Sequence, residues 1–166
     1  MKRHIGILLL LLSSVYGKAQ TKLPEFNDKP AYFNATTNEL IELEKSQYNT
    51  MAKAKGLFSA EGGFYLNGIK SSVTIKNKST LKFIVKVTPG TDPTSVFDLV
   101  KFEIRKDKRV LITTKAKATS TSTSFDKINY TIEKVKDGYY YLVVKNLASG
   151  EYFFGSGDFM FAFSLE

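Results

Sequence analysis

Apolar and polar residues alternate with a period of two from about residue 71 to the end of the chain. Such alternation places one set of side chains on a buried face and the other in water, which is typical of half-exposed antiparallel strands. The apolar members are mostly β-branched or aromatic, as strands prefer. The clearest alternating runs are residues 73–76, 81–88, 100–105, 128–133 and 159–165. The pattern predicts an all-β fold, and we expect an antiparallel β-sandwich.

Turn-forming residues separate these runs. They occur at residues 77–79, 89–93, 106–108, 137–138 and 155–158. Asp137-Gly138 predicts a two-residue type I′ turn between two strands, whereas the Thr119–Ser124 stretch predicts a polar loop or a ragged edge strand. No internal repeat and no long linker interrupts the pattern, so we expect residues 20–166 to form a single β-sandwich domain.

Residues 36–55 allow two interpretations. Thr36 and Glu39 have the spacing of a helical capping box, and apolar residues after them roughly follow a helical stripe. The alternative is a β-hairpin, with Ile41 and Leu43 inward on its first strand and Tyr48 on its second. The β pattern of the surrounding chain slightly favours strands.

A short motif lies between two strand patterns near the carboxyl end. Leu147, Gly150 and Tyr152 form the sequence Leu-x-x-Gly-x-Tyr, which is typical of the tyrosine corner of Greek-key sandwiches. There glycine allows a tight crossover, and the tyrosine hydroxyl bonds to backbone a few residues upstream. Because one more strand is expected after the motif, its position in the chain predicts an immunoglobulin-like Greek key.

The chain resembles a β-sandwich domain that recurs in exported proteins of Bacteroidota. The resemblance lies in Gly150-Glu-Tyr-Phe-Phe154 before a final aromatic strand, in Gly68-Ile-Lys-Ser71, and in Leu43-Glu-Lys45. It covers most of residues 30–165 and implies the same β-sandwich. That domain has no established activity, so no functional residue is implied by the resemblance.

Two aromatic runs, Tyr139-Tyr140-Tyr141 and Phe153-Phe154, place large rings on both faces of their strands. One face must belong to the core. The other face is a second buried face, an exposed ligand patch or a partner surface. Burial is the commoner case, and we favour it.

The first 19 residues have the three parts of an export signal. A basic start at Lys2-Arg3-His4 precedes an apolar run from Ile5 to Val15, and small residues follow at Gly17 and Ala19. The run is too short to span a bilayer as a helix, which needs about 20 residues. We therefore expect residues 1–19 to be a cleaved signal peptide, with no transmembrane segment after it. The ending Lys18-Ala19-Gln20 resembles export signals common in Bacteroidota. The expected location is extracytoplasmic: the periplasm, the cell surface or the medium.

The net charge of the chain after cleavage is modestly positive. Cleavage would leave 21 basic residues against 16 acidic ones, a net charge of +5 instead of the +8 of the whole chain. This favours weak attraction to anionic surfaces. Nucleic acid is not an expected partner for an exported chain that keeps only two arginines.

Composition excludes several chemistries. The chain has no Cys and no Trp, and its single His is His4, within the expected signal. A Ser-His-Asp or Cys-His system then lacks its general base, and a conventional zinc or copper site lacks imidazole and thiolate ligands. We expect no catalytic residue, no metal and no cofactor. A pair of carboxylates acting on a glycosidic bond remains the enzymatic alternative.

The sequence places five basic residues within nine positions, on an expected hairpin. We treat them as the candidate binding residues: Lys101, Arg105, Lys106, Lys108 and Arg109. The favoured function is a non-catalytic β-sandwich module for binding or scaffolding at the cell envelope. Its partner would be an envelope protein or an anionic cell-surface polymer. The alternatives are a small carboxylate-dependent glycan hydrolase and an outer-membrane β-barrel, whose strands alternate in the same way.

Overall fold

The computed structural model of the chain describes residues 22–76 and 78–166. The expected signal peptide, residues 1–19, and the cleavage site before Gln20 lie outside the described residues, as does Asn77 of the first expected turn. No helix in the described part of the chain has the length and hydropathy needed to cross a bilayer.

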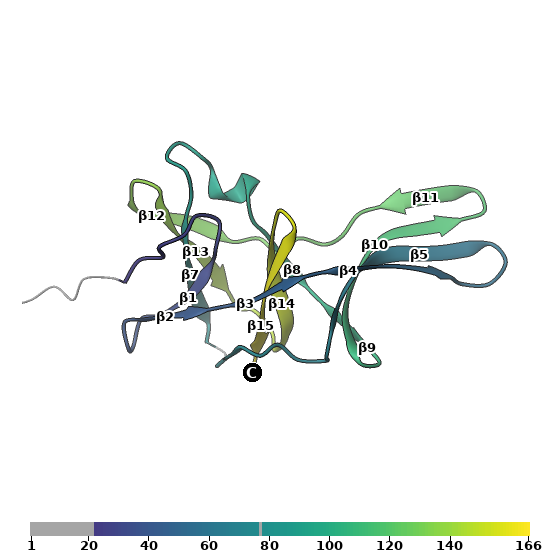
Figure 1. Cartoon of the computed structure of the whole chain (residues 1–166), viewed down its shortest axis with the longest axis horizontal. Coiled ribbons are helices and arrows are strands. Elements are labelled where there is room, and N and C mark those ends of the chain that lie inside the picture. The colour runs from purple at the N-terminus through teal and green to yellow at the C-terminus, as the bar shows by residue number, and fades with distance from the viewer. Residues whose placement is uncertain (1–21, 77) are drawn as a thin grey trace, which may run out of the picture.

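The predicted all-β class is confirmed: strands form three five-stranded open sheets, joined by turns and one short 3-10 helix, Pro93–Ser95 (Figure 1). Pairing is antiparallel except where β6 runs parallel to β15. The outer sheet has the order β12 (Thr131–Lys136), β13 (Tyr139–Lys145), β7 (Thr80–Lys86), β1 (Ala31–Asn34) and β2 (Glu39–Glu42). The central sheet has the order β3 (Glu44–Gln47), β15 (Phe159–Leu165), β14 (Gly150–Ser156) and β8 (Asp98–Lys101), with β6 (Thr74–Ile75) beside β15.

The third sheet projects from the other two and is called the arm (Figure 1). Its order is β11 (Ser120–Thr123), β10 (Lys108–Lys117), β5 (Ser59–Asn67) and β4 (Asn49–Ala54), with β9 (Glu103–Arg105) also pairing with β10. The outer and central sheets together are called the body. Two runs of chain pass from body to arm with only one residue outside a strand: β3 continues into β4, and β8 continues into β9.

Two hydrophobic cores lie on the two faces of the central sheet. Between the central and outer sheets, the largest fully buried side chains include Phe83, Phe154 and Phe163. On the opposite face, Phe153 and Met160 pack with arm residues such as Leu66. The preference for burial on both faces of Phe153-Phe154 is therefore confirmed, because each ring fills a different core.

Residues 36–55 form strands, as the β interpretation predicted, but not a hairpin. β2 pairs with β1, β3 with β15, and β4 with β5, so three successive strands enter three different sheets. Leu43 is buried, whereas Ile41 is exposed. Local alternation specifies a strand but not its pairing partner.

The turn at Asp137-Gly138 joins β12 to β13, but it is not of type I′. Gly138 has a positive φ of 76°, whereas Asp137 is not among the residues with positive φ. The register shifts between Lys134 and Lys136, so a bulge accompanies the turn. The Thr119–Ser124 stretch contains β11, an edge strand whose four residues are all exposed.

The Leu147–Tyr152 motif carries the chain from the outer to the central sheet. The Tyr152 hydroxyl donates a hydrogen bond of 2.7 Å to the backbone oxygen of Ala148, the bond that a tyrosine corner makes. Leu147 packs in the core between the two sheets. Gly150 has a φ of 153°, a backbone conformation that residues with a Cβ rarely adopt, so the position favours glycine.

Candidate binding cleft between body and arm

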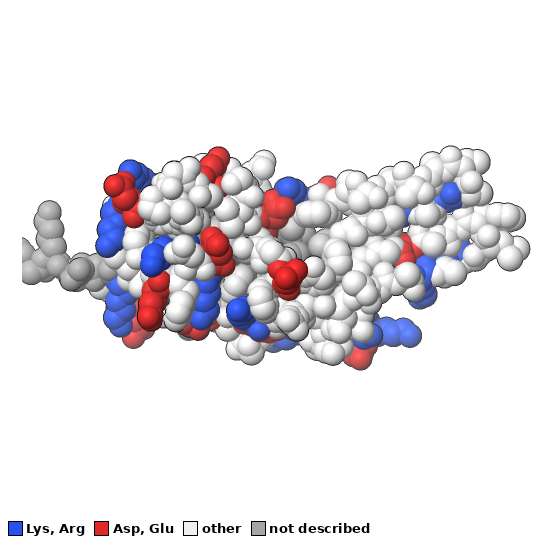
Figure 2. Space-filling view, turned by 45° about the horizontal axis from the view of Figure 1, so that its top comes forward, with Lys and Arg blue, Asp and Glu red and all other residues white. Residues whose placement is uncertain are grey.

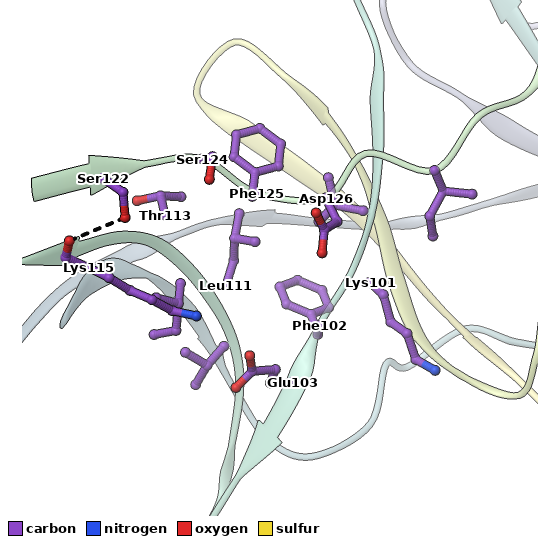
Figure 3. Close-up of a pocket in the computed structure, with 14 residues that line it drawn as sticks. Lys101, Phe102, Glu103, Leu111, Thr113, Lys115, Ser122, Ser124, Phe125 and Asp126 are labelled. Atoms are coloured by element: carbon purple, nitrogen blue, oxygen red, sulfur yellow. Dashed lines mark hydrogen bonds between the residues drawn. The ribbon is translucent and has the colours of Figure 1, made fainter.

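A cleft of about 660 Å³ opens where the arm leaves the body (Figure 3). Three stretches of chain line it: residues 100–103, which pass from β8 into β9; residues 110–115 of β10; and residues 122–128, which return from β11. Phe102, Leu111 and Phe125 surround the same space in Figure 3. The ring centre of Phe102 lies 4.5 Å from that of Phe153, with the two rings tilted by 33°, so Phe102 joins the cleft to the second core.

Phe125 is half-buried and begins a segment that crosses the edge of the central sheet. Farther along, the backbone N–H of Ile128 donates to Leu99 at 2.8 Å, and Lys127 forms an ion pair of 2.8 Å with Asp98. A smaller hollow of about 270 Å³ shares four lining residues with the cleft, Phe125 among them. Phe125 therefore forms a common wall of the two hollows.

The polar groups of the cleft carry both signs of charge. Lys101, Glu103, Lys115 and Asp126 lie around it, together with hydroxyl groups of Ser and Thr. Figure 3 shows Asp126 directed toward Phe102 and Lys101 directed away from it. Half of the lining residues are apolar, Phe102 and Phe125 among them, and the other half are polar or charged. Ligand sites are likewise concave and combine apolar side chains with polar groups that fix orientation.

Four of the five candidate basic residues lie on the hairpin of β9 and β10, whereas Lys101 lies on β8 of the central sheet, contrary to the expectation of a single hairpin. The five residues do not gather exposed positive charge. Lys101 and Lys106 are exposed. The ammonium group of Lys108 lies 4.0 Å from the ring centre of Tyr65. The two arginines are held in ion pairs.

Arg109 is buried, contrary to the expectation that it forms part of an exposed surface. Its side chain is 3% exposed and binds Glu44 of β3 through two hydrogen bonds, of 2.7 and 3.2 Å. It also donates to the backbone oxygens of Gly68 at 3.2 Å and Asn67 at 3.3 Å. Arg109 therefore ties the base of the arm to the edge of the central sheet.

Glu44 completes this network. Its carboxylate also accepts hydrogen bonds from the Ser71 hydroxyl at 2.8 Å and the Ser72 backbone N–H at 2.7 Å. Burial alone would raise the pKa of Glu44, but the hydrogen bonds from Arg109, Ser71 and Ser72 outweigh it and lower the pKa to about 2. The Glu44 carboxylate is therefore ionised at neutral pH.

Arg105 is partly exposed but is also engaged. It contacts Glu61 of β5 at 2.7 Å and Glu103 at 2.6 Å. Hydrogen bonds from Lys55 and Arg105 lower the pKa of Glu61 to about 2. Because carboxylates offset both arginines, the hairpin is a weaker site for an anionic polymer than its sequence indicated.

The acidic groups with shifted pKa values do not resemble catalytic acids. Besides Glu44 and Glu61, Asp137 has its pKa lowered, by a hydrogen bond from Lys134. A carboxylic acid that protonates a leaving group needs a raised pKa instead. In residues 22–76 and 78–166, no three His, Cys, Asp or Glu side chains are grouped so as to hold a metal ion.

Sequence reasoning missed the cleft because its walls come from segments that meet only in the folded chain. One signal was present: Phe125 is an isolated aromatic residue after the polar stretch from Thr119 to Ser124. No protein-family model, curated protein or solved structure matches the chain, so the cleft is interpreted from its own geometry.

Proposed function

We propose that the protein is an exported, non-catalytic β-sandwich module that binds a partner protein at the cell envelope through the cleft between body and arm. The observation that carries the proposal is the cleft, which combines apolar side chains, Phe102 and Phe125 among them, with charged groups of both signs. An anionic polymer would favour a uniformly positive surface, whereas a polypeptide segment offers apolar side chains and both charges.

The body itself is proposed to be an immunoglobulin-like Greek key. Constant-type immunoglobulin domains place strands A, B, E and D in one sheet and C, F and G in the other. In this proposal, β1, β7, β13 and β12 of the outer sheet correspond to strands A, B, E and D. Strands β8, β14 and β15 of the central sheet correspond to strands C, F and G. The arm would then consist of two insertions, one before strand B and one after strand C.

Phe125 provides the sharpest test, because it lines the cleft while remaining half-buried. Phe125→Ser should reduce capture of the partner from envelope extract at least tenfold, as loss of an aromatic interface anchor does. Phe33→Ser is the matched control, since Phe33 is another half-buried aromatic residue and packs against Tyr141 on the outer sheet. Bound proteins are identified by mass spectrometry with each variant as bait.

Equal capture of partner protein by wild type and Phe125→Ser would contradict the proposal that the partner binds in the cleft. Retention on protein-free envelope polymer, weakening as salt rises, would favour the anionic-polymer alternative instead. Cleavage of glycan by purified protein would contradict the non-catalytic proposal.

A further inference from the structure

The far end of the arm exposes two large apolar side chains. Leu57 is 92% exposed and Phe58 is 73% exposed, and both lie in the turn between β4 and β5. This turn is the tip of the arm, remote from the outer sheet (Figure 1). Adjacent exposed Leu and Phe residues at a projecting tip indicate a contact with an apolar phase or partner.

Lysines lie directly behind the tip. Lys117 of β10 is opposite Ser59, and Lys53 of β4 and Lys115 of β10 are both opposite Glu61. Residues opposite each other in antiparallel strands share a face, so these three lysines lie on one face of the arm. A fourth, Lys55, lies at the start of the turn and pairs with Glu61 at 2.7 Å.

Negative charge is absent from this end of the arm. Residues 53–60 and 115–124 contain four lysines and no acidic residue. Glu61, the first acid toward the body, is already bound by Lys55 and Arg105. In the described chain, no carboxylate pairs with Lys53, Lys115 or Lys117. On the face shown in Figure 2, charged side chains are dense over the body and sparse on the arm.

The spacing of apolar and basic groups matches the layers of a lipid surface. A strand rises about 3.4 Å per residue. Lys117, opposite Ser59, therefore lies roughly 3 Å from Phe58 toward the body. Lys53 and Lys115, opposite Glu61, lie roughly 10 Å from Phe58 in the same direction. Apolar groups of interfacial anchors enter about 5–10 Å into the boundary between headgroups and acyl chains. Lysines at these distances would lie among the phosphate groups.

We propose that the arm tip inserts Leu57 and Phe58 into the interface of an anionic lipid bilayer, with Lys53, Lys115 and Lys117 bound to the headgroups. Only Lys115 also lines the cleft. The other residues of this contact are separate from the cleft, and the proposal does not depend on it. A second copy joined tip to tip is a poorer occupant, because it would bring two sets of unpaired lysines together.

The chain contains no Trp, so a tryptophan introduced at the tip is the sole indole reporter. The signal-processed protein, verified by intact mass, is prepared as Phe58→Trp and mixed with vesicles of phosphatidylethanolamine and phosphatidylglycerol. Its emission should shift to the blue and be quenched by brominated acyl chains. Ile104→Trp, at another exposed apolar position on β9, is the control and should show neither change. Unchanged Phe58→Trp emission would overturn the proposal.

Vesicle flotation measures the energetic contribution of each part. Leu57→Ser/Phe58→Ser should lower the partition coefficient at least tenfold, and Lys53→Gln/Lys117→Gln should lower it about fivefold per lysine. Ile69→Ser/Ile104→Ser, which removes two other exposed apolar side chains, should leave it unchanged. Neutral phosphatidylcholine vesicles should bind wild type weakly.

The outcomes separate the two proposals. If the tip variants float with anionic vesicles as well as wild type does, the membrane contact is wrong, even when capture of a partner still depends on Phe125. If flotation depends on the tip while Phe125→Ser changes no capture, the membrane contact stands and the cleft proposal fails.

Discussion

Arg109→Gln is expected to destabilise the protein by about 3 kcal/mol, because it leaves the Glu44 carboxylate without its charged partner in a mostly buried position. Removing one member of a buried pair typically costs about 3–5 kcal/mol. The lower end applies here because the Glu44 side chain is 16% exposed and keeps its hydrogen bonds to Ser71 and Ser72. With a urea m-value of about 2 kcal/mol per M, the unfolding midpoint should fall by about 1.5 M.

Arg105→Gln is the matched control for this experiment. Arg105 makes two ion pairs as well, but its side chain is 34% exposed, so solvent screens them. Its loss should cost no more than about 1 kcal/mol, or about 0.5 M in the midpoint. A double-mutant cycle with Glu44→Gln should give a coupling energy of about 2 kcal/mol between Arg109 and Glu44.

Circular dichroism or intrinsic tyrosine fluorescence in urea, at pH 7 and fixed salt, measures all four proteins. The reasoning is refuted if Arg109→Gln and Arg105→Gln shift the midpoint equally, or if the cycle shows no coupling. The absence of coupling would mean that Arg109 contributes through packing and its hydrogen bonds to Gly68 and Asn67 instead of through the ion pair.

Three further predictions concern acid stability, the corner and processing. The pKa of Glu44 is lowered from 4.5 to about 2, so its stabilisation is complete above pH 4.5 and is lost as pH falls through 2. Urea midpoints measured between pH 6 and 2 should fall less steeply in Glu44→Gln than in wild type. Tyr152→Phe should cost about 0.5–1.5 kcal/mol by losing its hydroxyl bond, and Gly150→Ala should cost at least as much because of its positive φ; two unchanged midpoints would contradict the corner's role. The intact mass of the exported protein should equal that of a chain that begins at Gln20, allowing for pyroglutamate. A mass equal to that of a chain that still begins at Met1 would refute cleavage.

Strand content was predictable because alternation is a local property. Once one face of a strand is buried, a period of two is required whichever strand it pairs with. The hydroxyl bond of Tyr152 was predictable for a similar reason: Leu147, Gly150 and Tyr152 lie within six positions, and the bond joins residues four apart.

Pairing partners and charge neutralisation were not predictable. Arg109 is 65 positions from Glu44, and Arg105 is 44 positions from Glu61. The sequence therefore shows five basic residues within nine positions but does not show the carboxylates that pair with the two arginines. The cleft likewise depends on three separate stretches of chain, residues 100–103, 110–115 and 122–128, that line it together only in the folded protein. These are properties of the folded topology rather than of any short window.

The near-continuous passage of β3 into β4 and of β8 into β9 has a mechanical consequence. A pull on the arm is transmitted through two covalent strands to opposite edges of the central sheet, where β3 pairs with β15 and β8 pairs with β14. Force along the strands shears these rows of hydrogen bonds together instead of opening them one at a time. The arm is therefore joined to both edges of a sheet that is packed on both faces, and force applied to the arm would be resisted by hydrogen bonds at both of these edges.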